Sequence, residues 1–366
     1  MRKISALFLT ICLFLTCAGV LPVSAKAKEY SYDSKTKTLT INIKGEMKYD
    51  NHNAPWKDIK YPEHIVFMEG LTSIAETGFS FEIHGNTGDR YNNYDRIKTV
   101  KLPSTVKKIG SSAFSDCKKL TRINIPAGVK TICSGAFDGC KKLKSITIPK
   151  KAKLIGQSIF SNCSKLKKIT IPKGNKNISA GLFYQCKNLK TVKMYKGIER
   201  IEHEAFEFCE KLNSVRLPSS VKKIGYSAFK GCSKIKIINL PNSIEKIGEE
   251  AFLDCYSLKS IKLPKKIKTI NNFTFYSCKK LNKVTIQNQV TEIGNFAFAD
   301  CRNLKQVTIP KSVTKIGTRA LGYKYSPTDS DDGRYLCIKG FTIKGYKGTT
   351  AEKYAKKNGF KFVALD

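Results

Sequence analysis

Residues 109–131 read IGSSAFSDCKKLTRINIPAGVKT, and this pattern returns every 23 residues along most of the chain. Its clearest mark is a cysteine that lies three residues after a phenylalanine and three before a leucine or isoleucine. A fixed period of this length indicates one structural coil per repeat, with each coil burying its apolar side chains against its neighbours. The repeating cysteines are Cys117, Cys140, Cys163, Cys186, Cys209, Cys232, Cys255, Cys278 and Cys301.

Each repeat also contains a short alternating segment that predicts a β-strand. In KSITI, residues 144–148, Ile146 and Ile148 should point one way while Ser145 and Thr147 point the other. Because such segments recur once per coil in the same direction, we expect them to pair in parallel. Proline follows most of them and suits the end of a strand, since it has no backbone N–H to donate. The Ala-Phe pair before each cysteine predicts a tight helical turn that fills the coil centre.

The repeated string I-G-x-x-A-F-x-x-C-x-x-L-x-x-I-x-I-P-x-x-V resembles the BspA-like leucine-rich repeats of bacterial surface proteins, over about residues 65–321. One feature departs from the common leucine-rich pattern. The asparagine or cysteine that normally follows the strand is absent, because that place holds Gly128, Ser220 or Lys266. The resemblance implies a β-rich leucine-rich-repeat solenoid of 23-residue coils, with a parallel β-sheet on its concave face. It also implies an extracellular role in adhesion or recognition.

The two ends of the chain differ from the repeats. Residues 1–25 are predicted to be a signal peptide, with Arg2 and Lys3 before an apolar stretch and a small-residue cleavage site ending at Ala25. Residues 26–64 are predicted to form an N-terminal β cap, with Trp56 over the first coil, and residues 65–321 the solenoid. Residues 322–366 are predicted to form a C-terminal β-α-β cap. We therefore expect a secreted, extracellular protein, associated with the cell surface, that has no transmembrane span after signal cleavage.

Two insertions interrupt the pattern. The polar and aromatic stretch from Ser80 to Asp95 has no cysteine and could be either a binding loop or a neutral surface loop, since solenoid insertions map to loops. The second contains Asp329, Asp331 and Asp332, but its spacing does not fit a calcium loop, so a solvated turn is favoured. No metal and no cofactor is predicted.

Positive charge is the second large feature of the sequence. The formal net charge is +37, of which the predicted signal peptide carries +2, which leaves 37 − 2 = +35. One interpretation is solubility and protection of sheet edges, which lysine provides. The other is a surface that binds polyanions, because one lysine per coil produces columns of positive charge about 5 Å apart. Lysines directly before the strands illustrate such a column: Lys144, Lys167, Lys190, Lys236, Lys259 and Lys305.

The cysteines allow two interpretations. Without Cys12 and Cys17 of the signal peptide, 13 − 2 = 11 remain, and an odd number cannot all pair within one chain. Neighbouring members of the column should be close enough for disulfides, yet their side chains point in parallel. We therefore expect a column of buried, reduced thiols that act as small apolar side chains.

Catalytic motifs are absent from the sequence. The four histidines, His52, His64, His84 and His203, do not follow the repeat and form no recognisable catalytic motif, so no enzyme is predicted. The predicted function is macromolecule binding at the cell surface, in adhesion or recognition of a protein, a glycoprotein or a polyanion. The alternative is a structural envelope protein held non-covalently to anionic wall polymers. The expected partners are a protein or glycoprotein, or an anionic polysaccharide such as teichoic acid; nucleic acid is not expected, and the protein should be a monomer.

The predicted binding surface consists of the outward strand residues on the concave face. These positions vary between hydroxyl, amide and cationic side chains, whereas their inward neighbours remain aliphatic. They are Thr99, Lys101, Arg122, Asn124, Ser145, Thr147, Lys168, Thr170, Thr191, Lys193, Ser214, Arg216, Asn239, Lys262, Lys283 and Thr285.

Overall fold

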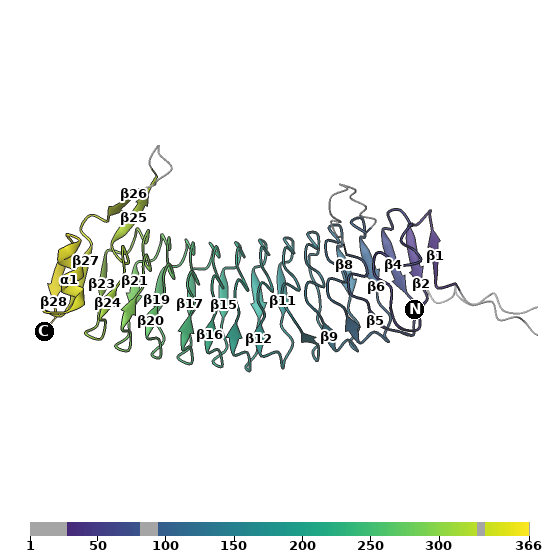
Figure 1. Ribbon diagram of the computed structural model, residues 1–366, viewed down its shortest axis with the longest axis horizontal. Coiled ribbons are helices and arrows are strands. Elements are labelled where there is room, and N and C mark those ends of the chain that lie inside the picture. The colour runs from purple at the N-terminus through teal and green to yellow at the C-terminus, as the bar shows by residue number, and fades with distance from the viewer. Residues whose placement is uncertain (1–27, 81–93, 328–333, 366) are drawn as a thin grey trace, which may run out of the picture.

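The computed structural model describes residues 28–80, 94–327 and 334–365. The chain winds into a solenoid whose coils lie side by side along one long axis (Figure 1). Parallel strands of successive coils pair with one another, so the predicted β-solenoid with parallel sheets is confirmed. The predicted signal peptide (1–25), nearly all of the insertion from Ser80 to Asp95, and the three aspartates at 329, 331 and 332 lie outside the described residues.

One set of strands, three or four residues long, forms what we call the long-strand face. The set comprises β2 (Thr38–Ile41), β4 (His64–Phe67), β6 (Thr99–Lys101), β8 (Arg122–Asn124), β11 (Lys168–Thr170), β13 (Thr191–Lys193), β15 (Ser214–Arg216), β17 (Ile237–Asn239), β19 (Ser260–Lys262), β21 (Lys283–Thr285), β23 (Gln306–Thr308), β27 (Thr342–Gly345) and β28 (Lys361–Ala364).

A second set, mostly two residues long, forms the short-strand face. It comprises β3 (Gly45–Glu46), β5 (Leu71–Ile74), β7 (Lys108–Ile109), β9 (Thr131–Ile132), β10 (Lys153–Leu154), β12 (Asn177–Ile178), β14 (Arg200–Ile201), β16 (Lys223–Ile224), β18 (Lys246–Ile247), β20 (Thr269–Ile270), β22 (Glu292–Ile293) and β24 (Lys315–Ile316).

The remaining elements lie near the two ends of the solenoid (Figure 1). Strand β1 (Tyr30–Asp33) pairs antiparallel with β2 and is the outermost strand of its sheet. Strands β25 (Tyr323–Ser326) and β26 (Arg334–Cys337) form an antiparallel pair. Helix α1 (Thr350–Lys357) connects β27 to β28, which pair in parallel. Glu352 accepts a hydrogen bond from the Gly348 N–H at 2.7 Å, which satisfies one backbone donor just before the helix.

Successive coils keep a common register on the long-strand face. Thr99 pairs with Arg122 and Val100 with Ile123, one repeat further along the chain. The prediction of a strand at residues 145–147 was wrong, because this segment has no strand pairing although Ile146 is buried and its neighbours are exposed. Among the described residues, segment 144–148 shares one backbone hydrogen bond with the following coil, from the Lys167 N–H to the Lys144 carbonyl at 3.3 Å. A single bond is too few to form a ladder.

A stack of phenylalanine rings runs through the centre of the solenoid. Neighbouring rings lie 5.1–6.0 Å apart, centroid to centroid, and within 21° of parallel. Trp56 extends the stack beyond Phe79 at 6.3 Å and is fully buried, as expected for a residue over the first coil. The stack consists of Phe79, Phe114, Phe137, Phe160, Phe183, Phe206, Phe229, Phe252, Phe275 and Phe298.

The segment before each cysteine, which we call the turn face, is not the helical turn predicted from the sequence. Two residues per coil take left-handed backbone angles four positions apart, as Ser112 (φ 51°) and Asp116 (φ 54°) do. The Phe114 N–H donates to the Ala136 carbonyl of the next coil at 2.9 Å. A helical turn would direct its N–H groups back into the same segment. Here the left-handed residues direct alternate N–H groups to the next coil, so this face also helps to hold the coils together.

Candidate functional site

The long-strand face presents the first and third residue of each three-residue strand to solvent, while the central residue is buried. Fifteen of the sixteen residues predicted from the sequence are exposed, and Thr99 is half-buried. Because the strands pair in register, these side chains form two parallel columns, with Thr99 beside Arg122 and Lys101 beside Asn124. The structure thus brings the predicted residues together on one face.

The two columns contain cations but no acid. At the outward positions of all described long strands, from Thr38 to Val363, there is no aspartate or glutamate. Within the described residues, none of the cations at these positions has a carboxylate within 4.0 Å. The cations are Lys101, Arg122, Lys168, Lys193, Arg216, Lys262, Lys283, Lys344 and Lys361.

A third column of lysines widens this positive surface. It lies one residue before the strands, or before the corresponding segment 145–147, and its members are exposed. In the described part of the chain, its members also lack ion pairs. We call these residues the edge lysines: Lys144, Lys167, Lys190, Lys236, Lys259 and Lys305.

Glu63, just before β4, pairs with Lys37 and Lys98, but most paired carboxylates lie elsewhere on the solenoid. On and beside the short-strand face, Glu199 pairs with Lys222 at 3.3 Å, Glu245 with Lys266 at 2.8 Å, and Glu292 with Lys315 at 2.6 Å. Such exposed pairs contribute little stability individually. Their location leaves the outward positions of the described long strands free of acid.

Within the three-residue strands of the long-strand face, four outward residues were not predicted from the sequence. Ile237 is the most informative, because its isoleucine side chain is 57% exposed. The sequence offers two adjacent isoleucines, 237 and 238, so either could have been the inward residue. Ile237 pairs with Ser214 and Ile238 with Val215, so Ile237 faces outward and Ile238 faces the core. The other missed residues are Ser260, Gln306 and Thr308, which counting by 23 residues would have found.

A buried charge cluster on the turn face was also missed. Glu207 is only 7% exposed, and its nearest cation is the Lys230 ammonium at 3.9 Å. Lys230 lies closer to Glu250, at 2.7 Å, and the Ser227 hydroxyl donates to the same Glu250 carboxylate at 3.1 Å. Burial raises the pKa of Glu207 to about 7, and Lys230 offsets only part of this effect. The cluster therefore contains a carboxyl group that titrates near neutral pH.

The repeating cysteines are buried and free of disulfides. Each Sγ lies 3.0–3.4 Å from the carbonyl oxygen of a phenylalanine in the preceding coil. Burial raises the pKa of each of these thiols well above its usual range, as for Cys140 and Cys209. Protonated thiols are poor nucleophiles, so this column has a structural role.

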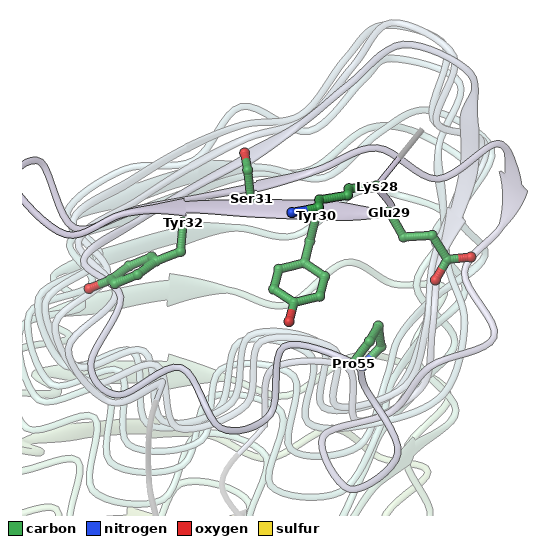
Figure 2. Close-up of a pocket in the computed structure, with 6 residues that line it drawn as sticks. All are labelled: Lys28, Glu29, Tyr30, Ser31, Tyr32 and Pro55. Atoms are coloured by element: carbon green, nitrogen blue, oxygen red, sulfur yellow. The ribbon is translucent and has the colours of Figure 1, made fainter. Parts of the chain in front are cut away.

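A shallow hollow of about 600 Å³ lies at the N-terminal end, along the outer strand β1. Figure 2 shows Tyr30 and Tyr32 extending from β1 to one side and Ser31 to the other, with Pro55 below the Tyr30 ring. Tyr30 packs edge-on against Trp56 at 6.0 Å. Glu29 accepts a hydrogen bond from the Tyr49 hydroxyl at 2.8 Å, so the carboxylate in this hollow already has a partner within the protein. These contacts fix the end of the solenoid.

No helix in residues 28–80, 94–327 and 334–365 is long and apolar enough to cross a membrane. Within the same ranges, no three histidine, cysteine, aspartate or glutamate side chains gather in a way that could hold a metal ion.

Comparison with known proteins gives a family match and several solved structures of the same fold. The model of the BspA type leucine rich repeat region matches residues 88–213 and 199–326. A leucine-rich repeat protein from Bacteroides ovatus is 23% identical, with a TM-score of 0.53 over 92% of this chain and 98% of that one. A leucine rich cell surface protein from Faecalibacterium prausnitzii is 21% identical, with a TM-score of 0.52 over 95% and 96%.

The pneumococcal vaccine antigen PcpA is 20% identical, with a TM-score of 0.54 over 93% of this chain and 98% of that one. At these identities the solved structures establish the fold alone. No curated protein matches the chain.

Proposed function

The chain belongs to the BspA-type leucine-rich repeat family, and on that premise we propose that it binds macromolecules through its long-strand face. The observation that carries the proposal is the charge pattern of that face. In the described structure, its outward columns contain many lysine, arginine, hydroxyl and amide side chains and no acid. The lysines and arginines of these columns have no ion pairs there. A surface of this kind attracts an anionic partner and repels a cationic one.

Affinity must come from several coils acting together. A single exposed ion contact contributes only about 0–1 kcal/mol. Strands of neighbouring coils lie about 4.8 Å apart, so an extended polyanion can contact several cations at once. Arg122, Lys168, Lys193 and Arg216 lie within five consecutive coils and are the central contacts of the proposed site. The edge lysines widen the same positive surface.

The ligand that fits best is an acidic polysaccharide, a teichoic-acid-like polymer or an acidic glycoprotein. We propose that the chain is secreted and acts at the cell surface, where it would meet such polymers. Nucleic acid fits less well, because single-stranded nucleic acids bind on aromatic platforms, and the outward positions of the long strands are not aromatic. The proposal assigns the protein a binding role without a catalytic step.

The test is an array of acidic glycans, neutral glycans and matrix proteins, probed with the mature protein at about 50 and 500 mM salt, below and above physiological ionic strength. The proposal requires binding to acidic polymers that weakens strongly at the higher salt. Preference for a neutral glycan, or acidic-polymer binding that is insensitive to salt, would reject it.

The total charge of +37 also supports a second candidate, a structural envelope protein held to anionic wall polymers by charge alone. Extraction of whole cells with high salt separates the two roles. A protein held only by wall charge should be released almost completely. A recognition protein should retain a large part of its binding to a purified partner after the same wash.

A further inference from the structure

A groove on the short-strand face, which we call the Tyr226 groove, has no role in the function proposed above. Its volume is about 950 Å³, within the roughly 300–1,000 Å³ that small-ligand sites usually have. It lies across β16, β18 and β20, near the middle of the solenoid, where Figure 1 labels β16. This face is separate from the long-strand face, because β16 and β18 belong to a different sheet.

Two glycines contribute to the lining of the groove. Gly225 and Gly248 follow β16 and β18, and their N–H groups continue the ladder by donating to the Ile201 and Ile224 carbonyls, each at 2.8 Å. A Cβ atom at Gly248 would lie 2.5 Å from the Gly225 carbonyl carbon. Only glycine allows the two coils to approach this closely. The two glycines therefore line the groove without side chains of their own.

Lysines occupy one wall of the groove. Lys223 and Lys246 pair directly across β16 and β18, and like charges in this arrangement repel each other. Neither lysine has a carboxylate partner among the described residues, and Lys268 adds a third unpaired cation. Glu245, the acid in the lining, is held by Lys266 at 2.8 Å. The wall therefore offers positive charge to an anion.

An exposed aromatic ring completes the site. Tyr226 is 41% exposed, and its backbone N–H donates to the His203 Nδ1 at 3.3 Å, which fixes the chain at this point. Exposed tyrosines offer an apolar face together with a polar hydroxyl group. A tyrosine that lines the same groove as three lysines matches a sugar that has an apolar C–H face and an acidic substituent.

A second pair of adjacent glycines in the same chain provides a contrast. Gly294 and Gly317 approach neighbouring backbone just as closely. There, however, the strand residues Glu292 and Lys315 pair with each other at 2.6 Å, and Asn295 takes the position that corresponds to Tyr226. The glycines alone are therefore a feature of coil packing. The two unpaired lysines and the tyrosine distinguish the Tyr226 groove.

We infer that the Tyr226 groove binds a carboxylate-bearing sugar residue of an acidic glycan, with the sugar ring against Tyr226 and the carboxylate between Lys223 and Lys246. The carboxylate would relieve the repulsion between the two lysines. A single residue bound in this way makes few contacts, so we expect a Kd between about 0.1 and 1 mM for a short oligosaccharide. This site is independent of the polymer track on the long-strand face.

Calorimetric titration of the mature protein tests the inference. Trigalacturonate represents uronic-acid polymers, sialyllactose represents sialylated glycans, and maltotriose is the neutral control. Saturable binding of at least one acidic trisaccharide, and none of maltotriose, is expected. Tyr226→Ala and the double variant Lys223→Gln/Lys246→Gln should each weaken binding about tenfold or more, which corresponds to 1.4 kcal/mol per tenfold. Whichever acidic sugar binds more tightly identifies the glycan class.

Matched variants keep the test specific. Tyr256→Ala removes another exposed tyrosine, and Lys130→Gln/Lys176→Gln removes two exposed lysines outside the groove; both should bind like the wild type. Changing Arg122, Lys168, Lys193 and Arg216 to serine should also leave trisaccharide binding intact, which separates this site from the long-strand face. Equal binding by the Tyr226→Ala variant, or competition by inorganic phosphate as strong as that by the trisaccharide, would overturn the inference.

Discussion

At the scale of single residues, the cysteine column shows how burial and hydrogen bonding determine chemistry. Cys209 donates to the Phe183 carbonyl at 3.2 Å, and that carbonyl also accepts the Cys186 N–H at 3.0 Å. Each thiol therefore has a fixed partner in the preceding coil. The sequence predicted buried thiols but not these acceptors, because the acceptor belongs to the backbone and its position depends on the stacking of the coils.

Thiol labelling checks this account of the column. In the native protein, Cys337 is exposed and should react quickly, and the partly buried Cys133 more slowly. The nine column thiols should react only after denaturation, because they are buried and their pKa values are raised. Rapid native labelling of several column cysteines would contradict this arrangement.

Substitution of Cys209 tests the hydrogen bond itself. Cys209→Ala should reduce the free energy of unfolding by about 1–2 kcal/mol through lost packing. Cys209→Ser should reduce the free energy of unfolding by a similar amount. Its hydroxyl can donate to the Phe183 carbonyl, which avoids most of the penalty of burying a polar group without a partner. Urea unfolding of the two variants provides the comparison. A serine variant less stable than the alanine variant by several kcal/mol would show that the hydroxyl does not find this acceptor.

Glu207 predicts a pH dependence of stability. Its pKa is raised to about 7 in the folded protein, from about 4.5 in an unfolded chain. Between these values the folded state holds a proton that the unfolded state has lost, so stability should fall as the pH rises from about 5 to 7 and level off above. Glu207→Gln should remove this fall and be more stable than the wild type at pH 8 by about 1–3 kcal/mol.

Urea unfolding at pH 5 and pH 8 measures this effect. Glu210→Gln, which changes an exposed carboxylate paired with Lys187, is the matched control and should behave like the wild type. If wild-type protein and the Glu207→Gln variant lose the same stability between the two pH values, the carboxyl group does not titrate there.

At the scale of elements, the sequence predicted the coil period, the inward and outward alternation, and a helix between two strands near residue 366, where α1 lies. All three follow from local spacing. The conformation of the turn face was not predictable in the same way, because its left-handed residues include serine, aspartate and glutamate in place of glycine. Hydrogen bonds to the next coil hold these angles, and such contacts cannot be read from one repeat alone.

The phenylalanine stack predicts strong coupling between coils. Phe206 lies 5.4 Å from Phe183 and 5.2 Å from Phe229, centroid to centroid. Phe206→Ala should destabilise the protein by about 3–5 kcal/mol, because it removes a buried ring from both neighbours. Each coil depends on its neighbours, so the unfolding transition should also broaden or split into two steps. A variant with a single sharp transition near the wild-type midpoint in urea would contradict this.

At the scale of the whole molecule, the sequence predicted the long-strand face and its lysines, but it did not predict that carboxylates avoid this face. Ion pairs such as Glu245–Lys266 connect successive coils through loops beside the short-strand face. Their location depends on which loops become neighbours when the coils stack. Ile237 was left out of the predicted surface for a similar reason, because strand pairing decides which of two adjacent isoleucines faces outward.

The most direct measurement of the central claim is the salt dependence of binding to a defined polyanion, such as a heparin fragment. Arg122, Lys168, Lys193 and Arg216 are changed together to serine. The control protein changes Lys107, Lys108, Lys130 and Lys176, which are exposed but lie on or beside the short-strand face, so it loses the same charge. In a plot of log K against log salt concentration, each lost contact should reduce the slope by about 0.7–0.9.

For the long-strand variant, the slope should fall by about three and binding should weaken, whereas the control should change little. The melting temperatures of both variants should be nearly unchanged. Equal effects of the two variants would show that net charge alone drives binding, and would contradict a binding site on the long-strand face.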